Sequence, residues 1–211
     1  MKTFFISDIH GNLPALEIVF NYIEDNDYVI VLGDVVNYGP WSNECVELLD
    51  NHKKKVCIIG NHEKYFLNGF YPHNKGLVND FFKICYNDFN NLEKLKLYIS
   101  DFAFNEFNCR HTINDKYIFK DTNIDISKNY IIGHSHQQYK IKINNFTLIN
   151  PGSVGQNRKN LDIISYCYFD HMNKNFYFKN IEYNSDIIIN KMKSLKYPLN
   201  CIEYYESKKN K

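Results

Sequence analysis

The stretch that decides the fold is Thr3-Phe4-Phe5-Ile6-Ser7-Asp8-Ile9-His10-Gly11-Asn12, close to the N-terminus. Its first four residues form a short, largely apolar run, which favours a buried strand. Residues i and i+2 share a side of an extended chain, so Asp8 and His10 can face the same ion. Apolar residues then recur at helical spacing from about Leu13, which predicts a helix that Asn12 can cap.

The same order of strand, polar loop and helix continues along the first third of the chain. Val29–Leu32 and Lys55–Ile59 are further apolar runs, and between them lies an expected helix that Ser42 can cap. A β-α-β-α-β order predicts parallel strands joined by helices. Ligands commonly collect outside the carboxyl ends of such strands, and Gly33-Asp34 and Gly60-Asn61-His62-Glu63 follow two of them.

The rest of the chain divides into a helical part and a part rich in strands. The segment from about residue 64 to 100 predicts a helical insert, and Asn144-Asn145 predicts a hairpin turn further on. A last helix is expected near Asp186–Leu195. We interpret residues 1–211 as one sandwich-like αβ domain. The β-type runs after Phe102 are Tyr117–Phe119, Tyr130–Ile132, Tyr139–Ile143, Phe146–Ile149, Ile163–Phe169 and Asn175–Ile181.

Composition excludes several classes of protein. The 211 residues are 44% hydrophobic and 23% charged with a formal net charge of +1, so nothing indicates a nucleic-acid or membrane surface. Six cysteines without a C-x-x-C pair, and a start that lacks a signal peptide, favour a reduced cytoplasmic protein. No apolar run is long enough for a spanning helix. The sequence leaves a homo-oligomer open.

Histidine, aspartate and asparagine residues gather at the expected strand ends. Besides the clusters above, His111 and Gly133-His134-Ser135-His136 follow β-type runs. Each cluster alone can be a turn or a helix cap, but their combination at four strand-to-loop junctions indicates a metal site. Imidazole and carboxylate ligands together suit Mn, Fe or Zn. The remaining histidines, His52, His73 and His171, are expected to be surface or packing residues.

Read in order, these motifs resemble the calcineurin-like metallophosphoesterase superfamily. The order is D-x-H, G-D, G-N-H-[D/E], a lone His and G-H-x-H, and the resemblance runs from Asp8 to about Arg158. The runs 33–40 and 150–156 are similar to those of its small single-domain bacterial and archaeal phosphodiesterase-like branch. The resemblance implies an α+β (αββα) fold of two packed mixed β-sheets flanked by helices.

The resemblance also implies a set of functional residues around two divalent metal ions. Manganese is the expected metal, with Fe, Zn, Co and Ni as alternatives. His62 would protonate the leaving oxygen, and His111 departs from the usual pattern because Thr112 follows it. The first metal would be bound by Asp8, His10 and His136, the second by Asn61, His111 and His134, with Asp34 bridging both and Asn12, Asn37 and Arg158 near the substrate; Asn12 equally suits a helix cap.

The expected function is hydrolysis of a phosphodiester or a nucleotide-type phosphomonoester by metal-activated hydroxide. A protein serine/threonine phosphatase is an alternative that fits less well, because only Arg110 and Arg158 could contact a phosphate through arginine. A catalytically silent metal-binding scaffold is another, and the presence of His62 argues against it. Aromatic residues of the insert, Tyr65, Phe66, Phe70 and Tyr71, could stack on a base, but packing inside the insert is favoured.

Overall fold

The first of two β-sheets contains the N-terminal strand. In this computed structural model, which describes residues 1–72 and 76–209, its strand order is β10-β9-β1-β2-β3. β1 pairs in parallel with β2, and β2 with β3, whereas β1 and β9 are antiparallel. The predicted parallel strands are thus confirmed. The bounds are Lys2–Ile6 (β1), Tyr28–Val31 (β2), Lys55–Cys57 (β3), Ile163–Asp170 (β9) and Asn175–Glu182 (β10).

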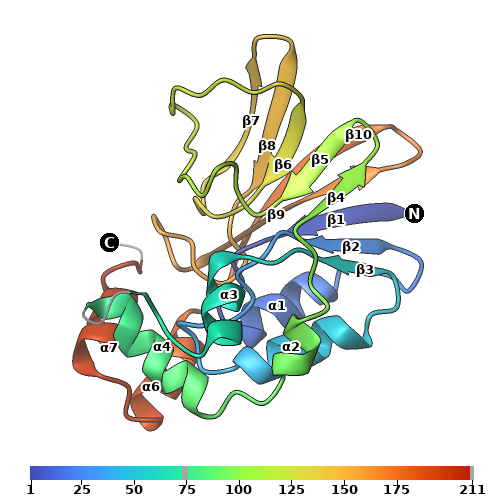
Figure 1. The fold of residues 1–211 in the computed structure, drawn as a ribbon. Helices are drawn as coiled ribbons and strands as arrows, with labels where there is room; N and C mark the ends of the chain where they lie inside the picture. The colour runs from blue at the N-terminus through green and yellow to red at the C-terminus, as the bar shows by residue number, and fades with distance from the viewer. Residues whose placement is uncertain (73–75, 210–211) are drawn as a thin grey trace.

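The second sheet packs face to face on the first (Figure 1). Phe5 and Cys167 of the first sheet meet Phe104, Cys109 and Ile131 of the second in one buried layer. Each such large apolar side chain contributes on the order of 2 kcal/mol on burial. The strand order is β4-β5-β6-β8-β7, with bounds Asp101–Phe104 (β4), Phe107–Arg110 (β5), Asn129–Ile132 (β6), Gln138–Ile143 (β7) and Phe146–Pro151 (β8).

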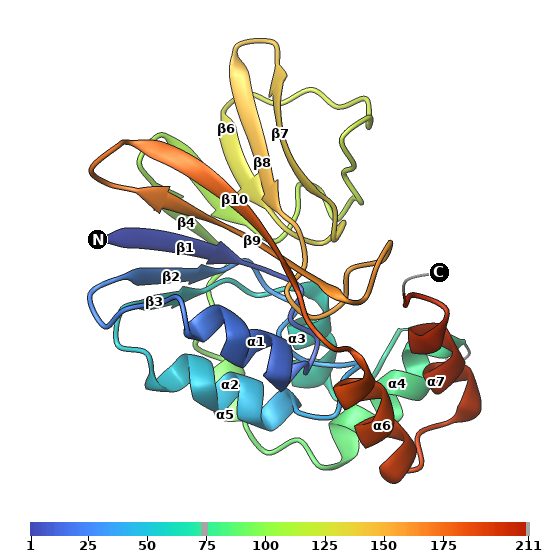
Figure 2. The same ribbon diagram turned by 180° about the vertical axis from the view of Figure 1, so that it is seen from behind.

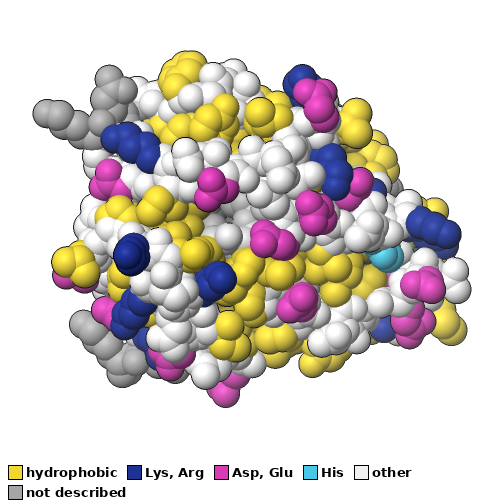
Figure 3. Space-filling model, turned by 90° about the horizontal axis from the view of Figure 1, so that it is seen from below, with side chains coloured by type: hydrophobic (Ala, Val, Ile, Leu, Met, Phe, Trp, Pro, Cys, Tyr) yellow, Lys and Arg dark blue, Asp and Glu magenta, His cyan; other side chains and the backbone are white. Residues whose placement is uncertain are grey.

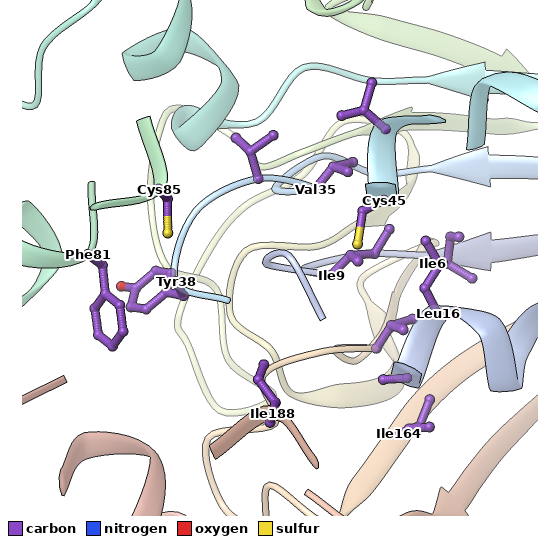
Figure 4. Close-up of a cluster of buried hydrophobic side chains, with 14 of the residues drawn as sticks. Ile6, Ile9, Leu16, Val35, Tyr38, Cys45, Phe81, Cys85, Ile164 and Ile188 are labelled. Atoms are coloured by element: carbon purple, nitrogen blue, oxygen red, sulfur yellow. The ribbon is translucent and has the colours of Figure 1, made fainter. Parts of the chain in front are cut away.

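Helices cover the outer face of the first sheet (Figures 1 and 2). Figure 4 shows how Ile6 of β1 lies together with Leu16 of α1 and Cys45 of α2 in this core. The expected sandwich of two mixed sheets with flanking helices is confirmed. The bounds are Leu13–Phe20 (α1), Ser42–Asn51 (α2), Asn61–Asn68 (α3), Leu77–Asn87 (α4), Leu92–Leu95 (α5), Asp186–Ser194 (α6) and Leu199–Glu206 (α7).

The outer face of the second sheet is covered by the loop between β5 and β6. Ile113, Ile118 and Ile126 of this loop pack on Tyr130 and Leu148. The prediction of a strand over 117–119 was wrong. Ile118 packs on the apolar face without joining a sheet, whereas Tyr117 is 48% exposed.

Other local predictions can be compared directly with the structure. The hairpin turn at Asn144-Asn145 joins β7 and β8, with Asn144 at a φ of 53°. Asn12 caps α1, since its Oδ1 accepts from the Ala15 N–H. Ser42 does not cap α2; its Oγ accepts instead from the Asn37 N–H. The helix α7 was not predicted, because Pro198 and the polar residues after it carry only a weak helical pattern.

The predicted insert is helical, as it contains most of α3 and all of α4 and α5. All six cysteines are free. On the helical face, Lys, Arg, Asp and Glu side chains are scattered among apolar ones (Figure 3). Among the described helices, none has the length and apolar character required to cross a membrane.

Candidate metal centre

The loops that follow β1, β2, β3, β5 and β6 meet at one edge of the sandwich. They bring together every residue that the resemblance assigned to a metal. The deepest group is Asp8, His10 and His136, which are 0%, 1% and 4% exposed. His136 Nε2 lies 3.3 Å from Asp8 Oδ1 and 3.3 Å from His10 Nε2. The ligand atoms of the three all lie within 4.8 Å of one another.

A second group surrounds His111. Its Nε2 lies 3.1 Å from Asn61 Oδ1 and 3.0 Å from His134 Nδ1. Asp34 Oδ2 is 3.2 Å from the same His111 atom and 3.9 Å from His10 Nε2. One carboxylate oxygen therefore lies between the two groups, where it can be shared.

Three of the four imidazoles are oriented by backbone carbonyl groups. When Nδ1–H donates to a carbonyl, the proton of the neutral ring is fixed on Nδ1, and Nε2 presents a bare lone pair to a metal. These contacts are His111 Nδ1 to Leu32 O at 2.7 Å, His136 Nδ1 to Gln156 O at 2.5 Å and His10 Nδ1 to Val36 O at 3.3 Å.

Each of the two carboxylates likewise uses one oxygen to accept a backbone hydrogen bond and leaves the other directed at the site. Asp8 Oδ2 accepts from the His134 N–H and Asp34 Oδ1 from the His62 N–H, both at 3.0 Å. Asp8 Oδ1 is buried without a hydrogen-bond partner among the described residues. A buried oxygen without a donor, beside two facing imidazole lone pairs, is costly unless a cation lies between them. The donor set therefore fits divalent first-row metals.

Electrostatics lead to the same conclusion. Burial lowers the pKa values of His10 and His136 well below 6.5, so both rings are neutral and able to bind a metal. Burial also lowers the pKa of His111, but the Asp34 and Asp8 carboxylates outweigh it and raise that pKa to about 9. The two carboxylates thus favour positive charge at this point, which the protonated His111 ring supplies in the ion-free protein and a bound cation would supply in its place.

The backbone at the site is unusual. Asp8, His10, Asp34, His134 and His136 all have positive φ, between 49° and 67°. This region is uncommon for residues other than glycine, and such strain clusters at functional sites. Gly60 is required beside them, because a Cβ there would come within 2.2 Å of Asp34 Oδ1.

His62 lies next to these groups but makes a different contact. Its Nδ1 is 2.8 Å from Asn37 Nδ2, and Asn37 Oδ1 is buried without a hydrogen-bond partner among the described residues. Turned by 180°, the same amide would accept from a protonated Nδ1 and satisfy that oxygen. His62 also lies within 4.8 Å of ligand atoms of His10 and Asp34, so a metal contact by His62 must be tested separately.

Two structural contributors to the site had no assigned role in the sequence. The Glu63 carboxylate, fully buried, accepts from the backbone N–H groups of Asp34, Val35, Val36 and Gly60 at 2.7–3.2 Å. It thereby fixes the loop that carries Asp34. Its place beside His62 in the Gly-Asn-His-Glu cluster was the only available signal.

Tyr117 is the second of these contributors. Its ring stacks on His134, with centroids 3.9 Å apart and an interplanar angle of 19°, and the Arg158 guanidinium lies 4.9 Å from the centroid of the Tyr117 ring. No sequence pattern linked Tyr117 to either residue, because the contact depends on how the loop folds.

Asn12 and the remaining histidines do not offer free ligand atoms at the site among the described residues. The Asn12 side chain is fully used, since Nδ2 donates to Gly155 O and Tyr183 Oη and Oδ1 caps α1. His52 contacts Asp27 O and His171 contacts Thr3 Oγ1, away from the site, as expected for packing residues. His73 lies outside the described residues.

Comparison with known proteins agrees with this geometry. Residues 1–166 match the family model of the calcineurin-like phosphoesterases. The chain is 32% identical over 212 residues to the uncharacterized protein MJ0912 of Methanocaldococcus jannaschii, covering 85% of this chain and 86% of that protein. A shorter match, 40% over 67 residues, relates 30% of this chain to 24% of a symmetrical bis(5'-nucleosyl)-tetraphosphatase of Buchnera aphidicola.

The fold has a close solved counterpart. A metallophosphoesterase from Sphaerobacter thermophilus superposes with a TM-score of 0.77 at 22% identity, covering 98% of this chain and 99% of that one. Fold and site thus define a metal-dependent phosphoesterase. The chain belongs to the calcineurin-like phosphoesterase family and is a hydrolase that acts on phosphoester bonds.

Proposed function

We propose that this protein is a two-metal phosphodiesterase or nucleotide-type phosphatase of the cytoplasm. Asp8, His10 and His136 bind one ion, while Asn61, His111 and His134 bind the other. The observation that carries the proposal is the position of Asp34 Oδ2, which lies 3.2 Å from His111 Nε2 and 3.9 Å from His10 Nε2 and so can bridge the two ions.

When bound, two such ions would activate a water for attack and neutralise phosphate charge, and manganese is the metal we favour. The protein itself positions the reacting groups. Burial of Asp8 and His10 keeps bulk water from the deep side of the site. Arg158, whose guanidinium interacts electrostatically with Asp8, adds positive charge for the phosphate.

His62 acts as the proton donor to the leaving oxygen. With Nδ1 held by the Asn37 amide, Nε2 is the nitrogen left to deliver a proton. His62 also lines the cavity from which a substrate can approach. We further propose that residues 1–211 act as one domain and that the insert at about 64–100 shapes the mouth of this cavity.

The test compares two single variants of the purified protein. His134→Ala removes a metal ligand, so the protein should bind one ion fewer and lose hydrolysis of bis(p-nitrophenyl) phosphate with Mn²⁺. His62→Ala should keep two ions per chain while turnover falls by roughly 100-fold or more. Loss of an ion in His62→Ala would make His62 a ligand. Full activity of His134→Ala would remove the two-metal proposal, and wild-type protein that binds Mn²⁺ without turnover would be a binding scaffold.

A further inference from the structure

A cavity of about 660 Å³ opens beside the candidate ligands of the second metal, Asn61, His111 and His134. Its floor contains Asn61, His111 and His134 together with His62. A phosphate at the metal centre would fill only the floor. Sites for whole small molecules commonly range from about 300 to 1,000 Å³, so the remaining space suits the organic part of an ester.

The wall of this cavity is formed by tyrosines from separate segments. Tyr65 comes from α3, Tyr71 from the segment after it, and Tyr117 from the loop between β5 and β6. Tyr65 and Tyr71 meet edge to face with centroids 5.0 Å apart. We call this whole cavity of about 660 Å³ the tyrosine cavity.

The aromatic residues of α3 lie in two places, one in the hydrophobic core and one at the tyrosine cavity. Phe66 is fully buried and packs edge to face on Phe82 and Phe89. Its neighbour Tyr65 is half-buried and lines the cavity instead. Packing, expected for the aromatic residues of the insert, therefore holds fully for Phe66, whereas Tyr65 packs against the core only in part and also lines the cavity.

Charge at the rim favours an anionic ligand. Lys64, Arg110 and Asp115 line the tyrosine cavity, so the charged side chains among its described lining residues carry a net positive charge. Phenol groups add hydrogen-bond donors beside the ring faces. Flat ring surfaces, hydroxyl groups and net positive charge in one space match a nucleotide better than an apolar ester or an extended peptide.

We propose that the tyrosine cavity binds the nucleobase of a nucleoside phosphate whose phosphate group lies at the metal centre. This inference rests on the proposed function, because the phosphate is located by the metals. Bases stack on aromatic side chains with little dependence on sequence, since every base has a π-face. Tyr117 stacks on His134, Tyr65 hydrogen-bonds to Asn61, and Tyr71 packs edge to face on Tyr65; we assign Tyr65 and Tyr71 the base.

The experiment measures binding to the Mn²⁺-loaded protein by calorimetry, which does not require turnover. Adenosine 5′-monophosphate and ribose 5-phosphate share sugar and phosphate and differ in the base alone. We expect adenosine 5′-monophosphate to bind about tenfold more tightly, as one stacked base implies. Tyr71→Leu should remove most of this difference. Phe70→Leu is the matched control, because Phe70 is 59% exposed, is not among the described lining residues and should leave the difference unchanged.

Several outcomes would overturn the assignment. Equal affinity of wild-type protein for the two compounds would do so, as would an unchanged difference in Tyr71→Leu. If phenyl phosphate bound as tightly as adenosine 5′-monophosphate, the cavity would recognise any aryl group, and the assignment to a nucleobase would be wrong. Failure of the proposed function is a separate result, namely absence of Mn²⁺-dependent hydrolysis of bis(p-nitrophenyl) phosphate, and the binding difference is measurable in either case.

Discussion

The two groups of candidate ligands differ in depth and in charge. The buried group, Asp8, His10 and His136, supplies a carboxylate and two imidazoles and is almost fully excluded from solvent. The cavity group, Asn61, His111 and His134, supplies a neutral amide in place of the carboxylate and lines the 660 Å³ cavity. From this difference we propose a division of work: of the two proposed ions, the one in the buried group would stay bound, and the one in the cavity group would face the substrate.

The strongest way to break this comparison is to remove the group that both sides share. Asp34→Asn replaces the bridging carboxylate by an amide of nearly the same shape. We expect kcat for bis(p-nitrophenyl) phosphate to fall by roughly 1,000-fold, because the attacking water loses its two-ion environment. Asp50→Asn, on the exposed end of α2, serves as the control and should be neutral. Activity of Asp34→Asn near the wild-type level would show that the groups act separately.

The next prediction concerns the support beneath Asp34. Glu63→Ala leaves the N–H groups of Asp34, Val35, Val36 and Gly60 buried without an acceptor. Each unsatisfied donor costs about 1–3 kcal/mol, although water entering the space recovers part of this, so we expect unfolding to become easier by about 3 kcal/mol. Urea unfolding of the ion-free protein measures it.

Glu63→Gln keeps the shape but replaces one accepting oxygen by an NH2 donor, so two of the four N–H groups keep their acceptor and the loss should be smaller than in Glu63→Ala. Wild-type stability of both variants would mean that these hydrogen bonds do not stabilise the loop. Glu47→Gln, on α2, is a control for the loss of one acidic charge.

Much of the site followed from the sequence because the junctions after β1, β2 and β3 place polar residues directly behind apolar strands. Asp8 and His10 were expected to share a side of an extended chain; both line the site, although with positive φ, and the glycines beside Asp34 and Asn61 indicated sharp turns. Local pattern carries that information. The positive φ of His134 and the stacking of Tyr117 on it arise from contacts between distant segments, so no window of sequence could reveal them.

The same distinction explains the errors in the fold. Ile118, in the middle of this segment, covers the apolar outer face of the second sheet, and coverage by a loop needs the same residue types as a strand. The helix α7 is stabilised by Cys201, Ile202 and Tyr205, which are buried against the rest of the molecule. Tertiary packing outweighs its weak local signal.

Removal of the metal ions by a chelator would compare the affinities of the buried group and the cavity group for their ions. A carboxylate ligand attracts a divalent ion more strongly than an amide does, and burial strengthens that attraction. We expect the cavity group to release its ion first, with dissociation constants that differ by about tenfold or more. Titration with a chelator, followed by metal analysis of the protein, should pass through a state with one ion per chain. Release of both ions in a single step would contradict the division of work.

The smallest expected effect separates proton transfer from metal binding. Asn37→Ala removes the amide that contacts His62 Nδ1, so the ring loses its fixed orientation while all candidate ligands stay in place. One neutral hydrogen bond is worth about 1 kcal/mol, which corresponds to a fall in kcat of about fivefold with two ions still bound. Loss of an ion in Asn37→Ala would mean that this loop supports the metal centre and not the proton donor. Asn43→Ala, at the start of α2 and paired with Asp88 and Asn90, controls for a change of asparagine outside the site.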